Sequence, residues 1–178
     1  MAEGESALLI PVPEAEELVG EWRSLYDPSS AAGVPAHITL LYPFIPRTEI
    51  TADTIEELRA HFAATRAFSY RFPKLARFPG VVYLAPTPDR PIRRMIGQLA
   101  ELYPEYPPYC GRFDDIVPHL TIADRRERLD LVLMNRVEGG IGRGLPLEAR
   151  ATEVWLMTNR RKRWTKKARF PLKTGSKR

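Results

Sequence analysis

The stretches HITLLY (residues 37–42) and HLTIAD (residues 119–124) share a histidine, an apolar residue and a threonine in the same order. The chain has only three histidines, so two of them stand in this one context. Side chains alternate between the faces of a strand, so in each stretch the histidine and the threonine share one face and aliphatic residues share the other. Each stretch is therefore predicted to be a strand with a core on one side and polar groups on the other.

The surroundings of the first stretch have the patterns of alternating strands and helices. In chain order we expect strand 6–12, helix 14–26, strand 35–42, helix 53–65, strand 67–75 and strand 80–85. The apolar residues at helical spacing, which we expect to face a core, are Ala15, Leu18, Val19, Trp22, Leu25, Ile55, Leu58 and Phe62. Thr51 or Asp53 is expected to cap the second helix, and the last two strands to pair as a hairpin across 78–80.

The surroundings of the second stretch repeat this order. We expect helix 91–103, strand 113–123, helix 125–137 capped by Asp124, a glycine-rich connector at 139–144, and a hairpin of 147–158 with 164–172. The expected core-facing residues of the two helices are Ile92, Met95, Ile96, Leu99, Leu102, Leu129, Val132 and Leu133. Helix, histidine strand, helix and hairpin thus occur twice. This order predicts one domain, 1–178, made of pseudo-repeats at about 6–88 and 89–172, with a basic tail at 173–178.

Composition excludes several classes of protein. With 44% hydrophobic residues in 178, the chain can bury a core without covalent staples. Its single cysteine, Cys110, excludes an intramolecular disulfide and a cysteine-built zinc site. The first residues carry acids where a signal peptide needs bases, and no stretch approaches the roughly 20 apolar residues that span a bilayer. We therefore expect a monomeric cytoplasmic protein with no membrane partner.

Charge is distributed unevenly along the chain. The net charge is +5, yet the first 21 residues contain acids and no base, and nothing after Glu153 is acidic. The basic run from Arg160 onward attracts polyanions, so contact with nucleic acid is one interpretation. A solvated hairpin tip followed by a frayed tail is the other.

Two histidines delivered by similar strands suit in-line attack on a phosphodiester. One imidazole takes a proton from the nucleophile, and the other protonates the departing oxygen on the opposite side; an unperturbed pKa near 6.5 allows both roles. The hydroxyls of Thr39 and Thr121 could donate to the non-bridging oxygens, where negative charge grows in the transition state. No metal ion is required.

Other interpretations of the motifs account for fewer of the residues. A metal site would need further ligands beside apolar strand neighbours, and a serine hydrolase would need a nucleophile in a G-x-S-x-G turn, which is absent. Two structural histidines on sheet faces are a third interpretation. His61 has no hydroxyl partner in its sequence HFA and is expected to be structural. The glycines at 139–144 follow a helix and not a strand, which favours a connector over a phosphate cradle.

At this point the sequence resembles a known family, the two-histidine phosphoesterases or 2′-5′ RNA ligase-like superfamily. Its signature is a pair of H-x-[S/T]-x motifs with apolar x positions, which 37–40 and 119–122 both match. Residues 78–84 look like the strand between the motifs, and 154–157 with 169–172 look like the closing hairpin. The resemblance therefore covers most of the chain.

The resemblance implies a fold and an activity. The implied fold is α+β and bilobal, a pseudo-twofold duplication of two antiparallel sheets with outer helices and a central cleft. Members of the family open 2′,3′-cyclic phosphates or act on RNA ends, and some join or cleave 2′-5′ RNA linkages, without a metal or other cofactor. For this chain it implies a metal-independent phosphodiesterase that acts on nucleotides or RNA ends, with 2′-5′ RNA ligation as a further option.

The resemblance also assigns residues to roles. His37 and His119 become the acid and base, and Thr39 and Thr121 hold the phosphate. Some members place an aromatic residue after the first motif and a basic residue after the second. The corresponding candidates for substrate binding, together with the tyrosine of the intervening strand, are Tyr42, Arg125, Arg126 and Tyr83. Strand alternation, however, is expected to turn Tyr42 toward the core with Leu40.

Two rival functions stay open from the sequence. An RNA-binding module could keep this fold without turnover and use the basic residues after Glu153. An enzyme for a small cyclic phosphodiester other than RNA would use the same four motif residues. The sequence does not distinguish these from a phosphodiesterase for RNA ends.

Overall fold

The structure is a computed structural model that describes residues 4–124 and 131–175. Its strands are β1 (Ser6–Pro11), β2 (His37–Leu41), β3 (Phe68–Phe72), β4 (Leu75–Phe78), β5 (Val81–Leu84), β6 (Leu120–Asp124), β7 (Leu147–Ala151), β8 (Glu153–Arg160) and β9 (Arg163–Pro171). Its α-helices are α1 (Glu16–Tyr26), α2 (Pro28–Ala31), α3 (Ala52–Ala64), α4 (Arg90–Leu102) and α5 (Leu131–Ile141). Single 3-10 turns occur at Pro13–Ala15, Pro108–Gly111 and Gly142–Gly144.

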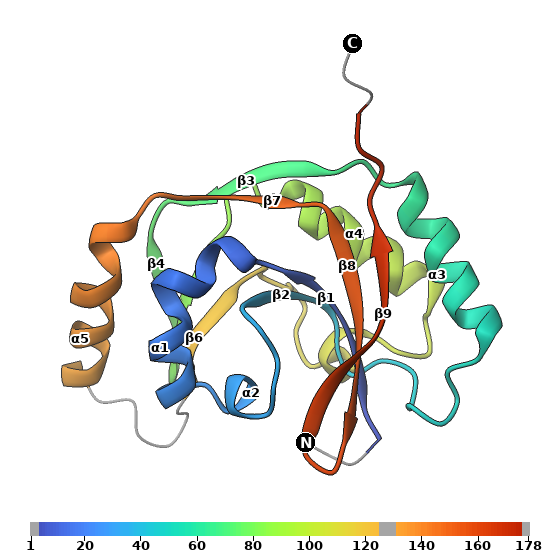
Figure 1. Ribbon diagram of the computed structural model, residues 1–178, viewed down its shortest axis with the longest axis horizontal. Coiled ribbons are helices and arrows are strands. Elements are labelled where there is room, and N and C mark those ends of the chain that lie inside the picture. Colours follow the sequence, from blue (N-terminus) through green and yellow to red (C-terminus); the bar gives the residue numbers. More distant parts are fainter. Residues whose placement is uncertain (1–3, 125–130, 176–178) are drawn as a thin grey trace.

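The described strands form antiparallel sheets, as an α+β fold requires. One sheet has the order β2-β1-β8-β9, a second has the order β4-β5-β6, and β3 pairs with β7. In Figure 1, β3 and β7 run across the molecule between an end with α1 and α5 and an end with α3. The motif strands β2 and β6 are both edge strands of their sheets, and they contact each other. The expected second lobe, central cleft and repeat boundaries stay predictions.

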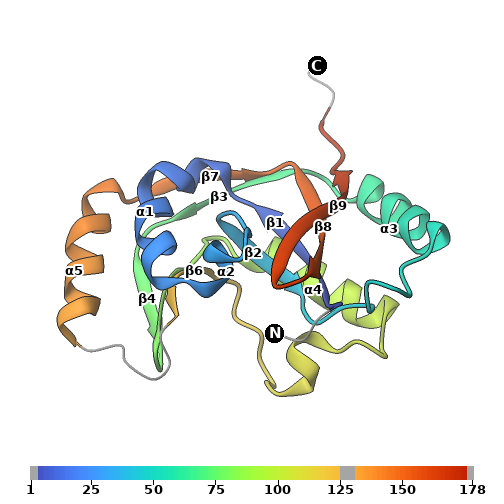
Figure 2. The ribbon, with the colours of Figure 1, turned by 60° about the horizontal axis from the view of Figure 1, so that its bottom comes forward.

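Two helices, α1 and α4, each pack against a motif strand that they do not directly precede in the chain. Helix α1 connects β1 to β2 but packs against β6, whereas α4 connects β5 to β6 but packs against β2. The turned view in Figure 2 shows α1 beside β6, away from α4. Each motif strand is therefore supported by the helix that precedes the other motif.

Apolar residues of both sheets meet in one core. Ile38 and Leu40 of β2 and Leu120 and Ile122 of β6 are all at most 2% exposed and belong to it. A second, smaller cluster covers the opposite face of the four-stranded sheet and consists of Ala7, Leu9, Val34, Met157 and Trp164. Every residue of β1 is buried, because apolar clusters cover both faces of the sheet at this strand.

Local sequence signals account for most element boundaries. The hydroxyl of Thr51 accepts a hydrogen bond from the Thr54 amide at 3.1 Å and caps α3, as expected. Pro91 lies in the first turn of α4, where its missing N–H costs nothing. Helix α2 was not expected; the Asp27 carboxylate caps it by accepting from the Ser29 amide at 2.9 Å.

One predicted strand pairing is wrong, and one predicted strand is divided in two. Most of the strand predicted at 67–75 forms β3, which pairs with β7 and not with 80–85. The hairpin across 78–80 instead joins β4, which begins at Leu75, to β5. Pro73 separates β3 from β4 because it cannot donate to a ladder. The strand predicted at 147–158 divides at Thr152, where the chain passes from the pair with β3 to the pair with β1. Its second part, β8, pairs with β9, so the predicted closing hairpin is confirmed for that part.

Several predicted boundaries and inward faces also need correction. Strand 113–123 begins only at Leu120, after Pro118, which lacks a ladder donor. Helix α5 extends through the glycines at 139–140 that were expected in a loop. Residues 125–130, with Leu129, lie outside the described residues. The residues expected inward but found exposed are Leu25 at 57%, Leu102 at 36% and Val132 at 67%.

Candidate active site

The two motif stretches have the same backbone irregularity. Between β1 and β2, Leu8 pairs with Leu41 and Leu9 with Thr39, which leaves Leu40 as an extra residue. Between β5 and β6, Val82 pairs with Ala123 and Tyr83 with Thr121, which leaves Ile122 extra in the same way. Each stretch thus carries a bulge directly after its threonine. The sequence does not predict these bulges, because both extra residues, Leu40 and Ile122, are ordinary aliphatic strand residues.

The bulge reverses the alternation of side chains beyond it. In both stretches the third position is half-buried, the fourth and fifth are buried, and the sixth is half-buried again. Tyr42 therefore does not turn toward the core with Leu40, and this expectation is wrong. Its ring packs on Trp164 in the second cluster, and its hydroxyl donates to Glu5 at 3.0 Å. Burial and the Glu5 carboxylate raise the pKa of Tyr42 to about 12.

The two histidine rings are held by matching hydrogen bonds. Nδ1 of His37 lies 2.7 Å from the carbonyl oxygen of Pro35, and Nδ1 of His119 lies 2.8 Å from that of Val117. A carbonyl only accepts, so Nδ1 carries the hydrogen in both rings. The neutral ring then has its lone pair on Nε2, which is the nitrogen available for proton transfer.

Aromatic rings surround the second histidine. Phe78 and Tyr83 stack on each other with centroids 4.2 Å apart, and each meets His119 edge to face, at 5.3 and 5.4 Å. Tyr83 is only 6% exposed. Its predicted role in substrate binding stays a prediction, while its contact with His119 is direct. Phe78 was not predicted as a site residue from the sequence, and it forms the second aromatic contact of His119.

Burial and charge shape the protonation of both histidines. Burial lowers the pKa of His37 to about 4; the charge of Arg23 and, to a smaller extent, that of His119 act in the same direction. Burial also lowers the pKa of His119, against its bond to Val117 and the charge of Asp124, which raise it. Because the charge of His119 is felt at His37, the two rings lie in one electrostatic environment.

The motif threonines are half-buried on the same faces as the histidines. Thr39 pairs with Leu9, and Thr121 pairs with Tyr83. Among the described residues, no protein group hydrogen-bonds to either threonine hydroxyl. Each hydroxyl can therefore donate to an incoming oxygen without breaking an existing bond.

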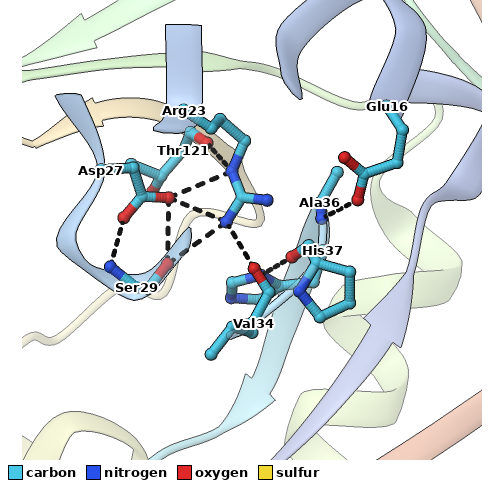
Figure 3. Close-up of polar contacts among 9 residues, drawn as sticks. Glu16, Arg23, Asp27, Ser29, Val34, Ala36, His37 and Thr121 are labelled. Carbon is cyan, nitrogen blue, oxygen red and sulfur yellow. Dashed lines mark hydrogen bonds and ion pairs between the residues drawn. The ribbon is translucent and has the colours of Figure 1, made fainter. Parts of the chain in front are cut away.

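A buried arginine joins the two motifs, and the sequence did not reveal it. Arg23 of α1 is 1% exposed and pairs with Asp27, with Nη2 2.8 Å from Oδ2. Figure 3 shows the guanidinium between Asp27, Ser29, the Val34 carbonyl and the Thr121 carbonyl, with His37 nearby. One signal in the sequence could have indicated this buried pair. Arg23 lies four residues after Val19, on the inward face of the helix, and Asp27 follows four residues later, at the spacing of a helical ion pair.

The remaining predicted residues are placed as follows. Arg125 and Arg126 lie outside the described residues. A pocket of about 360 Å³ opens beside Pro35, between the start of β2 and the start of β8, and Trp155 contributes to its wall. Neither motif histidine lines it. Within 4–124 and 131–175, no group of three or more His, Cys, Asp or Glu side chains is placed to hold a metal ion.

No helix among the described residues is long and apolar enough to cross a bilayer.

Comparison with known proteins gives the family of the chain. A model of the 2'-5' RNA ligase superfamily matches residues 11–163, which is most of the chain. The protein therefore belongs to the 2'-5' RNA ligase superfamily.

Relatives in sequence carry compatible names. A protein of Oceanobacillus iheyensis, whose name marks it as an inferred phosphoesterase, is 30% identical over 124 residues, which are 67% of this chain and 69% of that protein. A protein of Geobacillus kaustophilus with the same kind of name is 29% identical over 120 residues, 65% of this chain and 66% of that protein. These relatives support the class of phosphoesterases.

Solved structures share the fold. The protein TT0787 of Thermus thermophilus matches with a TM-score of 0.62 at 18% identity, covering 94% of this chain and 97% of that one. LigT of E. coli in complex with 3'-AMP matches with a TM-score of 0.57 at 20% identity, covering 96% and 99%. These likenesses establish the α+β fold with its antiparallel sheets.

Proposed function

We propose that the chain is a phosphodiesterase that opens 2′,3′-cyclic phosphates of nucleotides or RNA ends. The observation that carries this proposal is the matched pair of motifs, each with its bulge, its Nδ1-anchored histidine and its available threonine hydroxyl. Membership in the 2'-5' RNA ligase superfamily supports the same class of reaction. LigT, which shares the fold, binds 3'-AMP and NADP+ in solved structures, which favours a nucleotide substrate here as well.

The proposed reaction uses four side chains and a water molecule. The base histidine accepts a proton at Nε2 as the water oxygen forms a bond to phosphorus. The bond from phosphorus to one ribose oxygen breaks, and the acid histidine gives its Nε2 proton to that oxygen. Thr39 and Thr121 donate hydrogen bonds to the non-bridging oxygens as their charge increases. The product is a phosphate monoester and a free ribose hydroxyl, so atoms and protons balance.

The direct test is an assay with defined substrates. Purified protein is incubated with 2′,3′-cyclic mononucleotides and with oligonucleotides that end in a cyclic phosphate, with and without a chelator. We expect a single monophosphate product, unaffected by the chelator, whose 2′ or 3′ position identifies the leaving oxygen. Loss of turnover on chelation, restored by a divalent metal, would refute the proposed chemistry.

An RNA-binding module without turnover is the second candidate. It is favoured by four exposed basic side chains at the β8–β9 turn, those of Arg160, Arg161, Lys162 and Arg163. Phosphate contacts there would give an affinity for RNA that falls steeply with salt. RNA binding that persists in a His37→Ala/His119→Ala variant, without hydrolysis of any cyclic substrate by the unaltered protein, would favour this candidate over the enzyme.

A further inference from the structure

Arg23 is a buried cation with an unusual set of partners. Its Nε donates to Asp27 at 3.0 Å and to the Thr121 carbonyl at 3.1 Å. Its Nη2 donates to Asp27 at 2.8 Å, to the Ser29 hydroxyl at 3.2 Å and to the Val34 carbonyl at 3.3 Å. A buried charge is costly unless it is paired and hydrogen-bonded, and these contacts satisfy most of the guanidinium.

Two of these contacts reach the backbone of the second motif and of the segment just before the first motif. Thr121 belongs to the second motif, and its carbonyl lies in β6, an edge strand of its sheet. Val34 is three residues before His37 and is followed by Pro35, whose carbonyl anchors the His37 ring. One planar fork therefore spans from the segment that holds His37 to the strand that presents Thr121 (Figure 3). Lysine could not make this pattern, because its ammonium is a compact point charge.

We propose that Arg23 is a positioning residue, which holds the segment before His37 and the strand of Thr121 in a fixed relative position and places its charge beside His37, so that His37 serves as the base and His119 as the acid. This inference rests on the proposed phosphodiesterase function. Arg23 is too buried to touch the substrate, and it acts through the backbone of Val34 and Thr121 and through its charge.

The charges around the two histidines differ in the required sense. His37 faces Arg23, Asp27 and His119; Arg23 has the strongest electrostatic influence of the three, and its charge lowers the pKa of His37. Burial lowers the pKa of His119 as well, but the charge that acts on this ring, that of Asp124, opposes the shift. Glu16, also on α1, accepts from the Ala36 amide and so faces the backbone beside His37. Neighbouring charges that act in opposite directions on two titrating groups favour different roles for them, here base and acid.

The roles of geometry and charge are separated by two variants. Arg23→Lys keeps the charge and loses the fork, so kcat should fall about 10–10²-fold while the acid limb of the pH profile stays in place. Arg23→Met/Asp27→Asn removes the buried pair together, which avoids an orphaned carboxylate. In this variant kcat should fall and the acid limb should move toward neutral pH, because the stronger of the two opposing charges on His37 is lost.

The titration of His37 gives a readout independent of turnover. The chain has only three histidines, so their ring C–H signals can be followed by NMR from neutral to acid pH and assigned with single variants. His37 should titrate at a higher pH in Arg23→Met/Asp27→Asn and at a lower pH in Asp27→Asn than in the unaltered protein. Arg93→Lys is the matched control. Arg93 also binds two carboxylates, those of Asp89 and Asp115, and it donates to the carbonyl of Ile116, three residues before His119. Its charge is not among those that shift the pKa of His37.

The outcomes for Arg23 and for the proposed function are distinguishable. An unaltered protein that hydrolyses no cyclic phosphate would refute the phosphodiesterase, while the NMR titration would still decide whether Arg23 controls His37. If Arg23→Met/Asp27→Asn folds, as its thermal unfolding shows, and His37 titrates as in the unaltered protein, the electrostatic role is overturned. Full kcat in a folded Arg23→Lys variant would overturn the role of the fork.

Discussion

His37 and His119 present the same nitrogen to the proposed substrate because the same backbone contact fixes each ring. The carbonyl two residues earlier accepts from Nδ1 in both cases, at 2.7 and 2.8 Å. Hydrogen bonds of this length fix the tautomer and the ring orientation together. In both motifs the acceptor lies in the segment that leads into the strand, two residues before the histidine, so the same local contact orients both rings.

Replacing either motif histidine should abolish most of the activity. His37→Ala and His119→Ala each remove a proton donor or acceptor, so kcat on a 2′,3′-cyclic nucleotide should fall at least about 10²-fold. The control is His61→Gln on α3, since His61 contacts Phe62 and neither motif histidine in the described structure. Either alanine variant with unchanged turnover would exclude that histidine from the reaction.

Replacing a motif threonine should affect the rate and not the pH profile. Thr39→Val and Thr121→Val keep the shape and remove a donor to the phosphate oxygens, so kcat should fall by about 10²-fold or more. The titrating groups stay, so both limbs of the pH profile should keep their positions. Thr165→Val, at an exposed position of β9, is the control. A shift of a limb without loss of rate would contradict the assigned role.

At the scale of elements, the fit of α5 against α1 depends on one glycine. A Cβ atom on Gly140 would lie 2.5 Å from Cζ2 of Trp22, whereas a Cβ on Gly139 would meet nothing within 4 Å. Both glycines lie in α5, where glycine is less favourable than alanine by about 1 kcal/mol. The clustered glycines suggested a loop at this point in the sequence. In the structure the Trp22 ring lies so close to Gly140 that this position of α5 has no room for a side chain.

Alanine at these neighbouring positions should therefore have opposite effects. Gly139→Ala should raise the free energy of unfolding by about 0.5–1 kcal/mol, through the lost freedom of the unfolded chain. Gly140→Ala should lower it by about 1–3 kcal/mol, because the Trp22 ring must move. Urea unfolding of both variants measures the difference. Equal effects of the two substitutions would show that Trp22 yields without cost.

At the scale of the whole molecule, the depressed pKa of His37 links stability to pH. Its ordinary value of 6.5 applies to the unfolded chain, and the folded value is about 4. Between these values the unfolded state binds a proton at His37 that the folded state does not bind. Stability contributed by neutral His37 is therefore complete above about pH 6.5 and is lost progressively as the pH falls toward 4.

This linkage should be visible in denaturation at two pH values. Between about pH 7.5 and 5, His37 should lower the free energy of unfolding by no more than about 2 kcal/mol, since one pKa unit corresponds to about 1.4 kcal/mol. The burial that lowers the pKa of His61 and His119 acts in the same direction, so the effect of His37 is isolated with His37→Gln. The variant should lose less stability than the unaltered protein over the same interval. An equal loss in both would contradict the assigned pKa.

The sequence by itself determined the motif strands, most of the helices and the sharing of one face by each histidine and its threonine. Those features depend on local propensity and on alternation, which act within a few residues. It also supplied the resemblance to the family that the comparisons confirmed.

Only the tertiary structure decided which strands pair, which way Tyr42 turns and what joins the motifs. The pairing of β3 with β7 joins segments far apart in the chain, and no local pattern encodes a partner at that separation. The bulges at Leu40 and Ile122 arise because each strand must fit a neighbour, and they reverse every side chain beyond them. Arg23 bonds to Thr121 across 98 residues because α1 packs on β6, the motif strand of the other half.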